Sequence, residues 1–371
     1  MTAKRVGIVG VGLISDIFIK NMIEMFTSTQ VVGCTARNWE HIKAKAEQFN
    51  IAAMTMDEMF EDSSIDIIVN LTPAAAHHEI IKRALTNGKH VYTEKSLALN
   101  YAQADELIKL ADAKGLLLGS APDTFLGSGV QTAIRAVNDG LIGDITGYSI
   151  VLNRGLELLY EFMDFLIKPG AGIGYDFGVY ALTALFSILG PADEVCGFLQ
   201  TNRPLREYKT SLKNRAGEQY EIENENIMAA AIKMRNGILG TLMCKGVAVF
   251  PEIPYLSLQG TRGILYLPDP NEFGGDVIYQ PGAMTPRQIR GGEQERILEN
   301  HHRYSEDSRG IGVADMATSL SEGRPHRANA TIQRHLLELL DGIVSSYNSK
   351  SYSKLTSDFV RPTPLTGDEV F

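Results

Sequence analysis

Short apolar runs alternate with helical patterns over the first third of the chain. The apolar runs predict strands, which lie at residues 5–10, 30–36, 65–72, 89–94 and 116–121. Apolar residues recur at helical spacing between them, at 13–25, 39–49, 76–86 and 101–114. Strands that alternate with helices of this length form βαβ units. The pattern therefore predicts an N-terminal, doubly wound parallel sheet of the α/β class.

The rhythm changes after about residue 123, where longer strand-like runs follow one another. They lie at 145–153, 194–202, 226–234, 238–246, 255–260 and 263–268. Turn signals at 235–237 and 261–263 join several of them, which favours hairpins and an antiparallel sheet. Further helices are expected at 128–139, 175–189 and 332–347. We therefore divide the chain into domains of 1–122 and 123–371, and leave open whether the last helix packs back on the first domain.

Composition and charge are those of a soluble globular protein. Hydrophobic residues make up 44% of the 371 residues and charged residues 21%, with a formal net charge of −9. An acidic chain offers no basic surface for nucleic acid or anionic lipid. No run reaches the roughly 18–20 apolar residues of a membrane helix, and no signal peptide is recognised. The three cysteines show no disulfide or metal-ligand spacing. We expect a cytoplasmic protein that binds a small molecule, without a metal.

The first strand runs directly into a glycine-rich turn, Gly10-x-Gly12-x-x-Ser15. In such a turn the first glycine permits the tight bend and the second lets the backbone approach a pyrophosphate. The third position needs only a small residue, and the helix N-terminus that follows offers N–H groups to the phosphates. We therefore expect a bound dinucleotide. The expected contacts in this turn are Gly10, Gly12, Leu13, Ile14 and Ser15.

The end of the second strand favours one dinucleotide over the other. An NAD-binding chain usually has a carboxylate there to hold the ribose 2′-hydroxyl. This chain has Arg37 instead, which can pair with a 2′-phosphate, and Thr35 and Asn38 can add hydrogen bonds. We therefore expect NADP(H), with NAD(H) as the alternative; a solvated Arg37 is the other interpretation.

Three further stretches carry candidate chemistry, and they read NLTPAAAHHEI (70–80), GKHVYTEKS (88–96) and GAGIGYDFGVYAL (170–182). Together with the glycine turn they resemble, in order and spacing, the Gfo/Idh/MocA (glucose–fructose oxidoreductase / inositol dehydrogenase) family. The resemblance runs through the whole nucleotide domain and more thinly through the second domain.

The resemblance implies a Rossmann domain followed by an α+β domain whose large, mostly antiparallel sheet forms homodimer or homotetramer interfaces. It implies an active site between the domains, acting on a hydroxyl or carbonyl of a sugar, cyclitol, glycoside or related polyol. Carried over residue by residue, Lys95 is the motif lysine, Asp176 the motif aspartate, and Tyr180 stands at the His/Tyr position. The further cofactor contacts implied are Thr72, Pro73, His77, Glu94 and Lys95.

The chemistry of these residues is consistent with that reaction. Hydride transfer from an alcohol to nicotinamide requires a base for the hydroxyl proton. A tyrosine has a pKa of about 10 and is a poor base alone, but a nearby ammonium lowers that pKa. We expect Tyr180 to exchange the proton, Lys95 to be its electrostatic partner, and Asp176 to position Lys95 or a substrate hydroxyl. Two alternatives stay open: Lys95 carries the proton itself, or Tyr180 is a core aromatic and Asp176 an ordinary helix-start residue.

Two departures from the family pattern affect this site. Ser96 follows Lys95 where the family has proline. A cis bond before a residue other than proline costs about 3 kcal/mol, so either this bond is trans and Lys95 shifts, or the strain is tolerated. The glycine run before Asp176 is interrupted, and the segment 154–170 is unusually apolar. This leaves room for a substrate with an apolar part, such as a glycoside or a dihydrodiol. The candidate substrate contacts are Lys95, Arg154, Glu157, Tyr160, Asp176 and Tyr180.

These features together predict an NADP(H)-dependent oxidoreductase of a sugar-like or polyol substrate. The alternative from another class is a non-enzymatic, dinucleotide-binding sensor or regulator on the same scaffold. The retention of Lys95, Asp176 and Tyr180 together favours the enzyme, because a sensor does not need a proton-transfer set.

Overall fold

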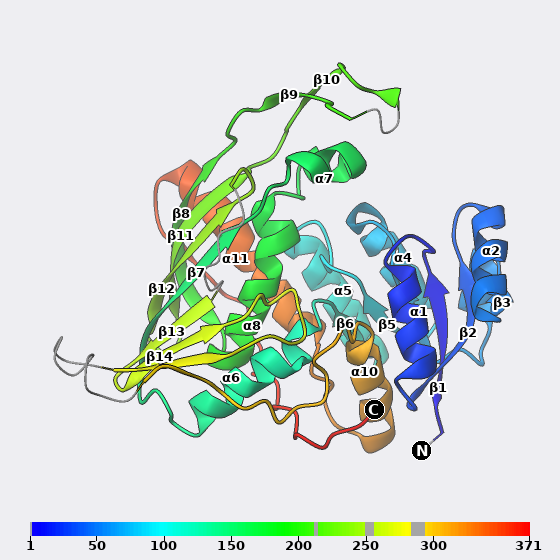
Figure 1. Ribbon diagram of the computed structural model, residues 1–371. Helices are drawn as coiled ribbons and strands as arrows, with labels where there is room; N and C mark the ends of the chain where they lie inside the picture. The colour runs from blue at the N-terminus through cyan, green and yellow to red at the C-terminus, as the bar shows by residue number, and fades with distance from the viewer. Residues whose placement is uncertain (1, 211–213, 249–255, 283–293) are drawn as a thin grey trace. The chain divides into compact units, whose positions relative to one another are not determined.

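The computed structural model describes residues 2–210, 214–248, 256–282 and 294–371. The chain forms two compact units (Figure 1). The first unit contains Met1–Ser128, His301–Arg334 and Pro362–Phe371, and the second contains Gly129–Asn300 and His335–Arg361. The chain thus leaves the first unit and returns to it twice.

The first unit is built on a parallel sheet, which has six strands among the described residues. The strand order is β3-β2-β1-β4-β5-β6, so the chain builds outward from β1 to β3 and then crosses to the other side at β4. The strands are β1 (Lys4–Val9), β2 (Thr29–Thr35), β3 (Ala52–Ala53), β4 (Ile67–Asn70), β5 (His90–Thr93) and β6 (Leu118–Ser120). The helices of this unit are α1 (Ser15–Glu24), α2 (Trp39–Phe49), α3 (Met56–Glu61), α4 (His77–Thr86), α5 (Tyr101–Lys114) and α10 (Ile311–Glu322). The predicted doubly wound, parallel α/β sheet is confirmed.

Local sequence signals account for several boundaries in this unit. β4 reads Ile-Ile-Val-Asn with all four residues buried, as expected for a central strand with both faces covered. α2 begins after Asn38, whose Oδ1 accepts the N–H groups of Glu40 and His41 at 2.9 and 3.3 Å. α5 ends at Gly115, which has a φ of 65° and can adopt this left-handed conformation without strain.

The returning segment 301–334 attaches to the edge of the parallel sheet. Asp123, which is 2% exposed, accepts two backbone N–H groups at the start of α10, each at 3.1 Å. Gly119 of the edge strand β6 forms a β-bridge with Asn329, so that this part of the edge is covered. The segment follows residue 122, where the sequence analysis places the boundary between the two domains. That domain boundary stays a prediction.

The second unit is built on a large mixed sheet, which has nine strands in the described ranges. The order is β16-β15-β14-β13-β7-β12-β11-β8-β17, and every neighbouring pair is antiparallel except β7 and β12. Its strands are β7 (Ile145–Asn153), β8 (Ala192–Gln200), β11 (Ile227–Met234), β12 (Leu239–Lys245), β13 (Leu256–Gly260), β14 (Gly263–Leu267), β15 (Ile278–Pro281), β16 (Arg296–Ile297) and β17 (Ser353–Lys354). The predicted α+β domain with a mostly antiparallel sheet is confirmed.

Helices and a separate hairpin complete this unit. Its helices are α6 (Ser128–Asn138), α7 (Glu157–Phe162), α8 (Val179–Leu189) and α11 (Ala330–Ser349), which begins in the first unit. Strands β9 (Leu205–Glu207) and β10 (Gln219–Glu221) form a two-stranded sheet of their own. α8 and α11 lie along one side of the large sheet (Figure 1). The ring of Phe186 on α8 packs against those of His335 and Phe359, with centroids 5.2 and 5.6 Å away.

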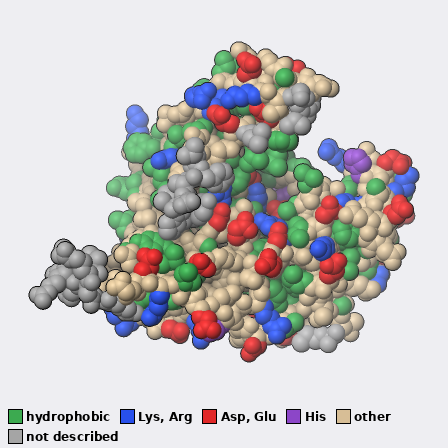
Figure 2. Space-filling model, in the orientation of Figure 1, with side chains coloured by type: hydrophobic (Ala, Val, Ile, Leu, Met, Phe, Trp, Pro, Cys, Tyr) green, Lys and Arg blue, Asp and Glu red, His purple; other side chains and the backbone are tan. Residues whose placement is uncertain are grey.

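The opposite side of this sheet exposes apolar side chains. Phe198 on β8 is 75% exposed, and its cross-strand neighbours Ala229 on β11 and then Met243 on β12 are half-buried. Figure 2 shows hydrophobic side chains gathered over β8, β11 and β12. Among the helices of the described residues, none combines the length and the apolar character that a membrane span requires.

Candidate active site

The glycine turn after β1 has the geometry that the sequence predicts. Gly10 has a φ of 101°, and a β-carbon there would lie 2.8 Å from the carbonyl carbon of Leu71 and 2.9 Å from the nitrogen of Thr72. Gly12 has no atom within 4 Å of the position where a β-carbon would stand. Ser15 is fully buried, and its Oγ donates to the Gly12 carbonyl at 2.6 Å. The first glycine is therefore needed for close backbone packing, whereas the second leaves open space before α1.

These observations fit a dinucleotide pyrophosphate. The open space at Gly12 adjoins the N-terminus of α1, which begins at Ser15, and N–H groups at such a terminus bind anions. Leu13 is 91% exposed beside it. At the end of β2, Thr35 is buried, and its Oγ1 has no hydrogen-bond partner among the described residues.

Arg37 and Asn38, two of the three polar residues predicted to hold a 2′-phosphate, have different surroundings just after β2. Arg37 is exposed and forms no ion pair with any residue in the described ranges. Asn38 is also exposed, but its Oδ1 caps α2. The Arg37 guanidinium is thus available to pair with a phosphate, whereas the amide oxygen of Asn38 already accepts hydrogen bonds from the first turn of α2.

Polar side chains join the ends of β4 and β5. Asn70, fully buried at the end of β4, accepts from Thr72 Oγ1 at 2.7 Å, and its Nδ2 donates to Thr93 Oγ1 at 3.0 Å. His77, also fully buried, places Nε2 2.7 Å from the Thr72 carbonyl oxygen and Nδ1 2.5 Å from the Ser96 carbonyl oxygen. We therefore expect His77 to hold these loops, rather than to contact the cofactor directly.

Lys95 lies at the carboxyl end of the parallel sheet, directly after β5. It is half-buried, and its N–H donates to Glu94 Oε2 at 3.1 Å. Burial raises the pKa of the Glu94 carboxyl; the Lys95 charge opposes this shift and the Asp123 charge adds to it. The bond from Lys95 to Ser96 is cis, which is the second of the two arrangements that the sequence left open.

Asp176 and Tyr180 stand together at the start of α8 in the second unit. Asp176 lies in a π-helical turn, Gly174–Gly178, and Tyr180 in the first turn of α8; both are half-buried. π-Helical turns within helices often mark functional sites. A β-carbon at Gly174 would lie 2.7 Å from Met228 Sδ on β11. The interrupted glycine run thus keeps a glycine where the turn packs tightly on the sheet.

The predicted catalytic residues are divided between the two units. Lys95 belongs to the first unit, and Asp176 and Tyr180 belong to the second. The structure brings Asp176 close to Tyr180 along one helical segment, and it brings Lys95 to the same sheet edge as the glycine turn. The meeting of Lys95 with Tyr180 stays a prediction.

The three candidate substrate contacts of the segment 154–170 have different environments. The Arg154 side chain is 7% exposed; it pairs with Asp269 at 2.6 Å, and its guanidinium carbon lies 5.7 Å from the Phe177 ring centroid. Tyr160 is 1% exposed. We therefore expect Arg154 to support the turn that carries Asp176. The role of Tyr160 as a substrate contact stays a prediction, and its side chain is packed in the core.

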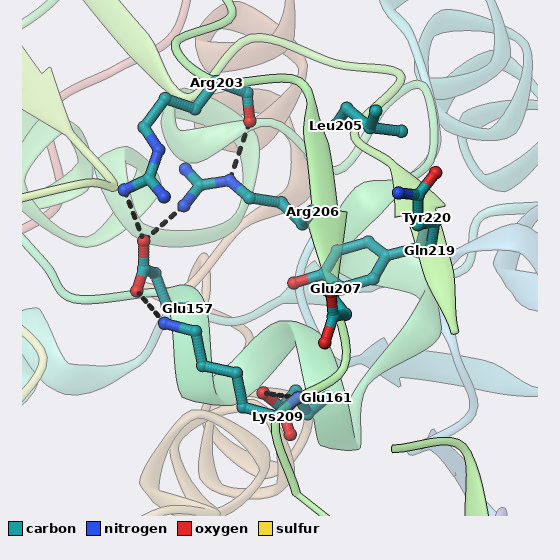
Figure 3. Close-up of a pocket in the computed structure, with 9 residues that line it drawn as sticks. All are labelled: Glu157, Glu161, Arg203, Leu205, Arg206, Glu207, Lys209, Gln219 and Tyr220. Atoms are coloured by element: carbon teal, nitrogen blue, oxygen red, sulfur yellow. Dashed lines mark hydrogen bonds and ion pairs between the residues drawn. The ribbon is translucent and has the colours of Figure 1, made fainter. Parts of the chain in front are cut away.

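Glu157 lines a cavity of about 280 Å³ within the second unit. Figure 3 shows Arg203, Arg206 and Lys209 directed at its carboxylate, with which all three form ion pairs. Glu161 accepts the backbone N–H of Lys209 at 3.0 Å. The cavity thus lies between α7 and the β9–β10 hairpin, and it is lined by Glu157, Glu161, Arg203, Leu205, Arg206, Glu207, Lys209, Gln219 and Tyr220. Its basic and acidic residues are equal in number, and Glu157 is committed to ion pairs.

The residues that contact Arg154 and Gly172 were not identified from the sequence. Asp269 holds Arg154 across more than a hundred positions, and no local pattern marks it. Glu225 approaches Gly172, where a β-carbon would collide with Glu225 Oε1; this buried oxygen has no hydrogen-bond partner in the described part of the chain. The glycine at 172 was the available signal, because it leaves room for that carboxylate. No group of three His, Cys, Asp or Glu residues in the described ranges is placed to hold a metal.

Comparison with protein families gives two matches that cover most of the chain. Residues 4–121 match the model of an oxidoreductase family with an NAD-binding Rossmann fold, and residues 130–266 match the GFO/IDH/MocA C-terminal domain.

Individual relatives are more distant. A trans-1,2-dihydrobenzene-1,2-diol dehydrogenase of Bos taurus is 25% identical, over 72% of this chain and 75% of its own. The scyllo-inositol 2-dehydrogenase (NADP(+)) of Bacillus subtilis is 25% identical, over 54% of this chain and 55% of its own. The chain spans about half the length of several curated relatives, 44% and 56% for two uncharacterised oxidoreductases of Schizosaccharomyces pombe. A levoglucosan dehydrogenase in complex with NADH has the same fold, with a TM-score of 0.81 and 18% identity over 96% of this chain and 100% of its own.

Proposed function

Because the chain belongs to the Gfo/Idh/MocA oxidoreductase family, we propose that it transfers a hydride between NADP(H) and a sugar-like substrate. The reacting group is a hydroxyl or carbonyl of a sugar, cyclitol, glycoside or related polyol. NADP(H) is preferred to NAD(H), and the nicotinamide supplies the hydride chemistry when it is bound.

The observation that carries this proposal is the alignment of three loops on one sheet edge. The glycine turn follows β1, Thr72 follows β4, and Lys95 follows β5, and these strands are neighbours in the parallel sheet. Ligands of such sheets bind at the carboxyl ends of the strands where the strand order reverses, which is between β1 and β4 here. A lysine placed there faces the ligand crevice rather than the core.

Each cofactor residue has a task that its position supports. Gly12 and the N-terminus of α1 bind the pyrophosphate, because the turn leaves open space and offers N–H donors. Arg37 binds the 2′-phosphate, because it is exposed, lacks an ion-pair partner among the described residues, and has no carboxylate beside it at the strand tip. The name of the Bacillus relative, which includes NADP(+), agrees with this preference.

Proton transfer falls to Tyr180 and Lys95. Tyr180 exchanges the proton of the substrate hydroxyl, and the Lys95 ammonium lowers its pKa toward neutrality. Asp176, on the π-helical turn that precedes Tyr180, positions the lysine or a substrate hydroxyl. Lys95 as the proton carrier is the alternative for this step.

The substrate has an apolar part in this proposal. The exposed side chains of Phe162 and Phe165 in the segment 154–170 support it, as does the resemblance to a dehydrogenase named for a dihydrobenzene diol. A panel of free sugars, cyclitols, glycosides and dihydrodiols, each assayed for NADP⁺ and NAD⁺ reduction, tests the class. Lys95→Ala and Tyr180→Phe test the mechanism on whichever substrate is found.

The outcomes separate enzyme from sensor. We expect turnover on at least one substrate and a loss of about a hundredfold or more in kcat for both variants. Tight NADPH binding with no turnover on the whole panel favours the regulator, and an active enzyme indifferent to both substitutions refutes the proton-transfer assignment.

We also propose that the exposed face of the large sheet is a homo-oligomer interface. The neighbouring apolar residues Phe198, Ala229 and Met243 on β8, β11 and β12 support this, because contiguous apolar surface of this kind marks interaction sites.

A further inference from the structure

His77 takes no part in the hydride or proton transfer proposed above. It nevertheless contacts two of the three loops that follow the carboxyl ends of β1, β4 and β5, namely those after β4 and β5. It is the first residue of α4, directly after the 3-10 turn Ala74–Ala76, and it is fully buried. Its two ring nitrogens lie 2.5 Å from the Ser96 carbonyl oxygen and 2.7 Å from the Thr72 carbonyl oxygen. The imidazole therefore bridges the loop after β5 and the loop after β4.

The chemistry of these contacts is restrictive. A carbonyl oxygen can only accept, so each ring nitrogen must donate a proton to form its bond. A neutral imidazole carries one N–H and holds one carbonyl, whereas the imidazolium holds both. Burial lowers the pKa of His77 and so does the Lys95 charge, whereas the bonds to Thr72 and Ser96 raise it. In either protonation state at least one of the loops is held by a donated hydrogen bond.

The two carbonyls belong to backbone that carries the proposed site. Ser96, which provides one of the two carbonyls, directly follows Lys95. The backbone N–H of Lys95 donates to the Glu94 carboxylate. On the other side, the nitrogen of Thr72 lies 2.9 Å from the position of a β-carbon at Gly10. The imidazole thus lies in a continuous line of backbone contacts from the glycine turn to Lys95.

We propose that His77 is a positioning residue that fixes the Lys95 ammonium relative to the glycine turn: its ring lies between the Ser96 and Thr72 carbonyls, and it donates to one of them as the neutral imidazole and to both as the imidazolium. The proposal rests on the role of Lys95 in the function proposed above. It differs from a purely structural role, because the Ser96 bond acts on Lys95 whereas the Thr72 bond acts on the cofactor loop.

Two amide side chains separate the two bonds. His77→Asn places an amide nitrogen where Nδ1 stands, so it can keep the Ser96 bond and loses the Thr72 bond. His77→Gln places its amide nitrogen near Nε2, so it keeps the Thr72 bond and loses the Ser96 bond. His77→Leu has the same branching and number of heavy atoms as the asparagine variant and donates to neither carbonyl. Each amide variant keeps one of the two donor positions that the ring offers, so their costs to folding are comparable.

The first measurement is steady-state kinetics with NADP⁺ and the substrate found in the panel. We expect His77→Asn to keep kcat within about threefold of the wild type and His77→Gln to lose about tenfold or more, because a displacement of about 1 Å can cost a hundredfold. The KM for NADP⁺ stays unchanged in His77→Gln and rises in His77→Asn. Equal losses of kcat in both amide variants overturn the proposal.

The second measurement does not depend on turnover. Acylation of Lys95 in the cofactor-free protein is followed by mass spectrometry, with the exposed Lys350 as internal reference. We expect the relative rate at Lys95 to change at least about threefold in His77→Gln and His77→Leu, because the accessibility of its amine depends on its placement. His77→Asn keeps the wild-type rate. Unchanged rates in all three variants overturn the proposal even if no substrate is found, and inactivity of the wild-type enzyme with altered Lys95 labelling refutes only the proposed function. If His77→Leu does not fold, the asparagine and glutamine pair decides.

Discussion

Replacing either glycine of the turn after β1 with alanine is expected to impair the protein, but in different ways: Gly10→Ala should lower stability, and Gly12→Ala should weaken NADPH binding. A β-carbon at Gly10 meets the backbone of Leu71 and Thr72 at 2.8 and 2.9 Å, and backbone cannot swing aside as a side chain can. The φ of 101° adds strain for any residue with a β-carbon. Gly12 has neither problem, because the space around it is open and its φ is outside the left-handed region.

The magnitudes follow from these distances. For Gly10→Ala, overpacking costs about 1–3 kcal/mol, and the unfavourable backbone conformation costs about 1–3 kcal/mol. We therefore expect Gly10→Ala to lose about 3 kcal/mol of unfolding free energy. For Gly12→Ala the folded state is not disturbed, and the restricted unfolded chain adds a gain of about 0.4–1 kcal/mol. Its methyl group instead fills the space proposed for the pyrophosphate, which should weaken NADPH binding by about tenfold or more, equivalent to about 1.4 kcal/mol.

Urea unfolding and NADPH fluorescence titration measure the two effects separately. Gly10→Ala should shift the unfolding midpoint strongly, whereas Gly12→Ala should keep or raise it while losing NADPH affinity. A Gly12→Ala protein that binds NADPH as the wild type does would refute the placement of the pyrophosphate. A Gly10→Ala protein of unchanged stability would refute the packing argument.

Three further outcomes are expected. Arg37→Gln should weaken NADPH binding about tenfold, because it removes a charged bond to the 2′-phosphate, and leave NADH binding unchanged; Lys43→Gln, which removes a nearby exposed cation paired with Glu40, is the control, and an equal loss for both cofactors contradicts the assignment. Burial lowers the pKa of His335 to about 4, and its Nε2 accepts the Ala192 N–H at 2.9 Å, whereas its unfolded pKa is about 6.5. The unfolded chain therefore takes up this proton first, so the unfolding free energy should fall as the pH drops from about 6.5 to 4, and His335→Gln should reduce that slope in urea titrations; an unaltered slope would show that His335 does not contribute. Phe198→Asp should convert a homo-oligomer to a smaller species in light scattering after gel filtration, because it places a charge in the proposed apolar interface; an unchanged mass argues for another interface.

Much of the first unit could be predicted because its signals are local. The run at 65–72 is apolar on both faces, and β4 forms within it. The glycine turn is also a local motif that the sequence shows directly after the first strand, although the backbone that approaches Gly10 comes from Leu71 and Thr72, about sixty positions away. Short elements with weak patterns were missed, among them α3 (Met56–Glu61), although its capping box at Thr55 and Glu58 is recognisable.

Features that depend on distant residues could not be predicted. The parallel pairing of β7 with β12 requires residues 145–153 and 239–245 to be placed side by side, and nothing in either run distinguishes it from a hairpin partner. The burial of Tyr160 and the pairing of Arg154 with Asp269 depend equally on tertiary packing. The sequence could therefore supply candidates for the substrate site, but not their exposure.

The bridge between Gly119 and Asn329 has a consequence for how this protein is made. During translation, β6 emerges from the ribosome long before residue 329 is synthesised, because the whole of 129–300 is translated in between. During that interval part of the outer edge of β6 lacks its native cover, and uncovered edges recruit strands from other chains. A nascent chain of this protein is therefore expected to need chaperone protection until its last segments emerge, and residues 1–128 expressed alone should aggregate.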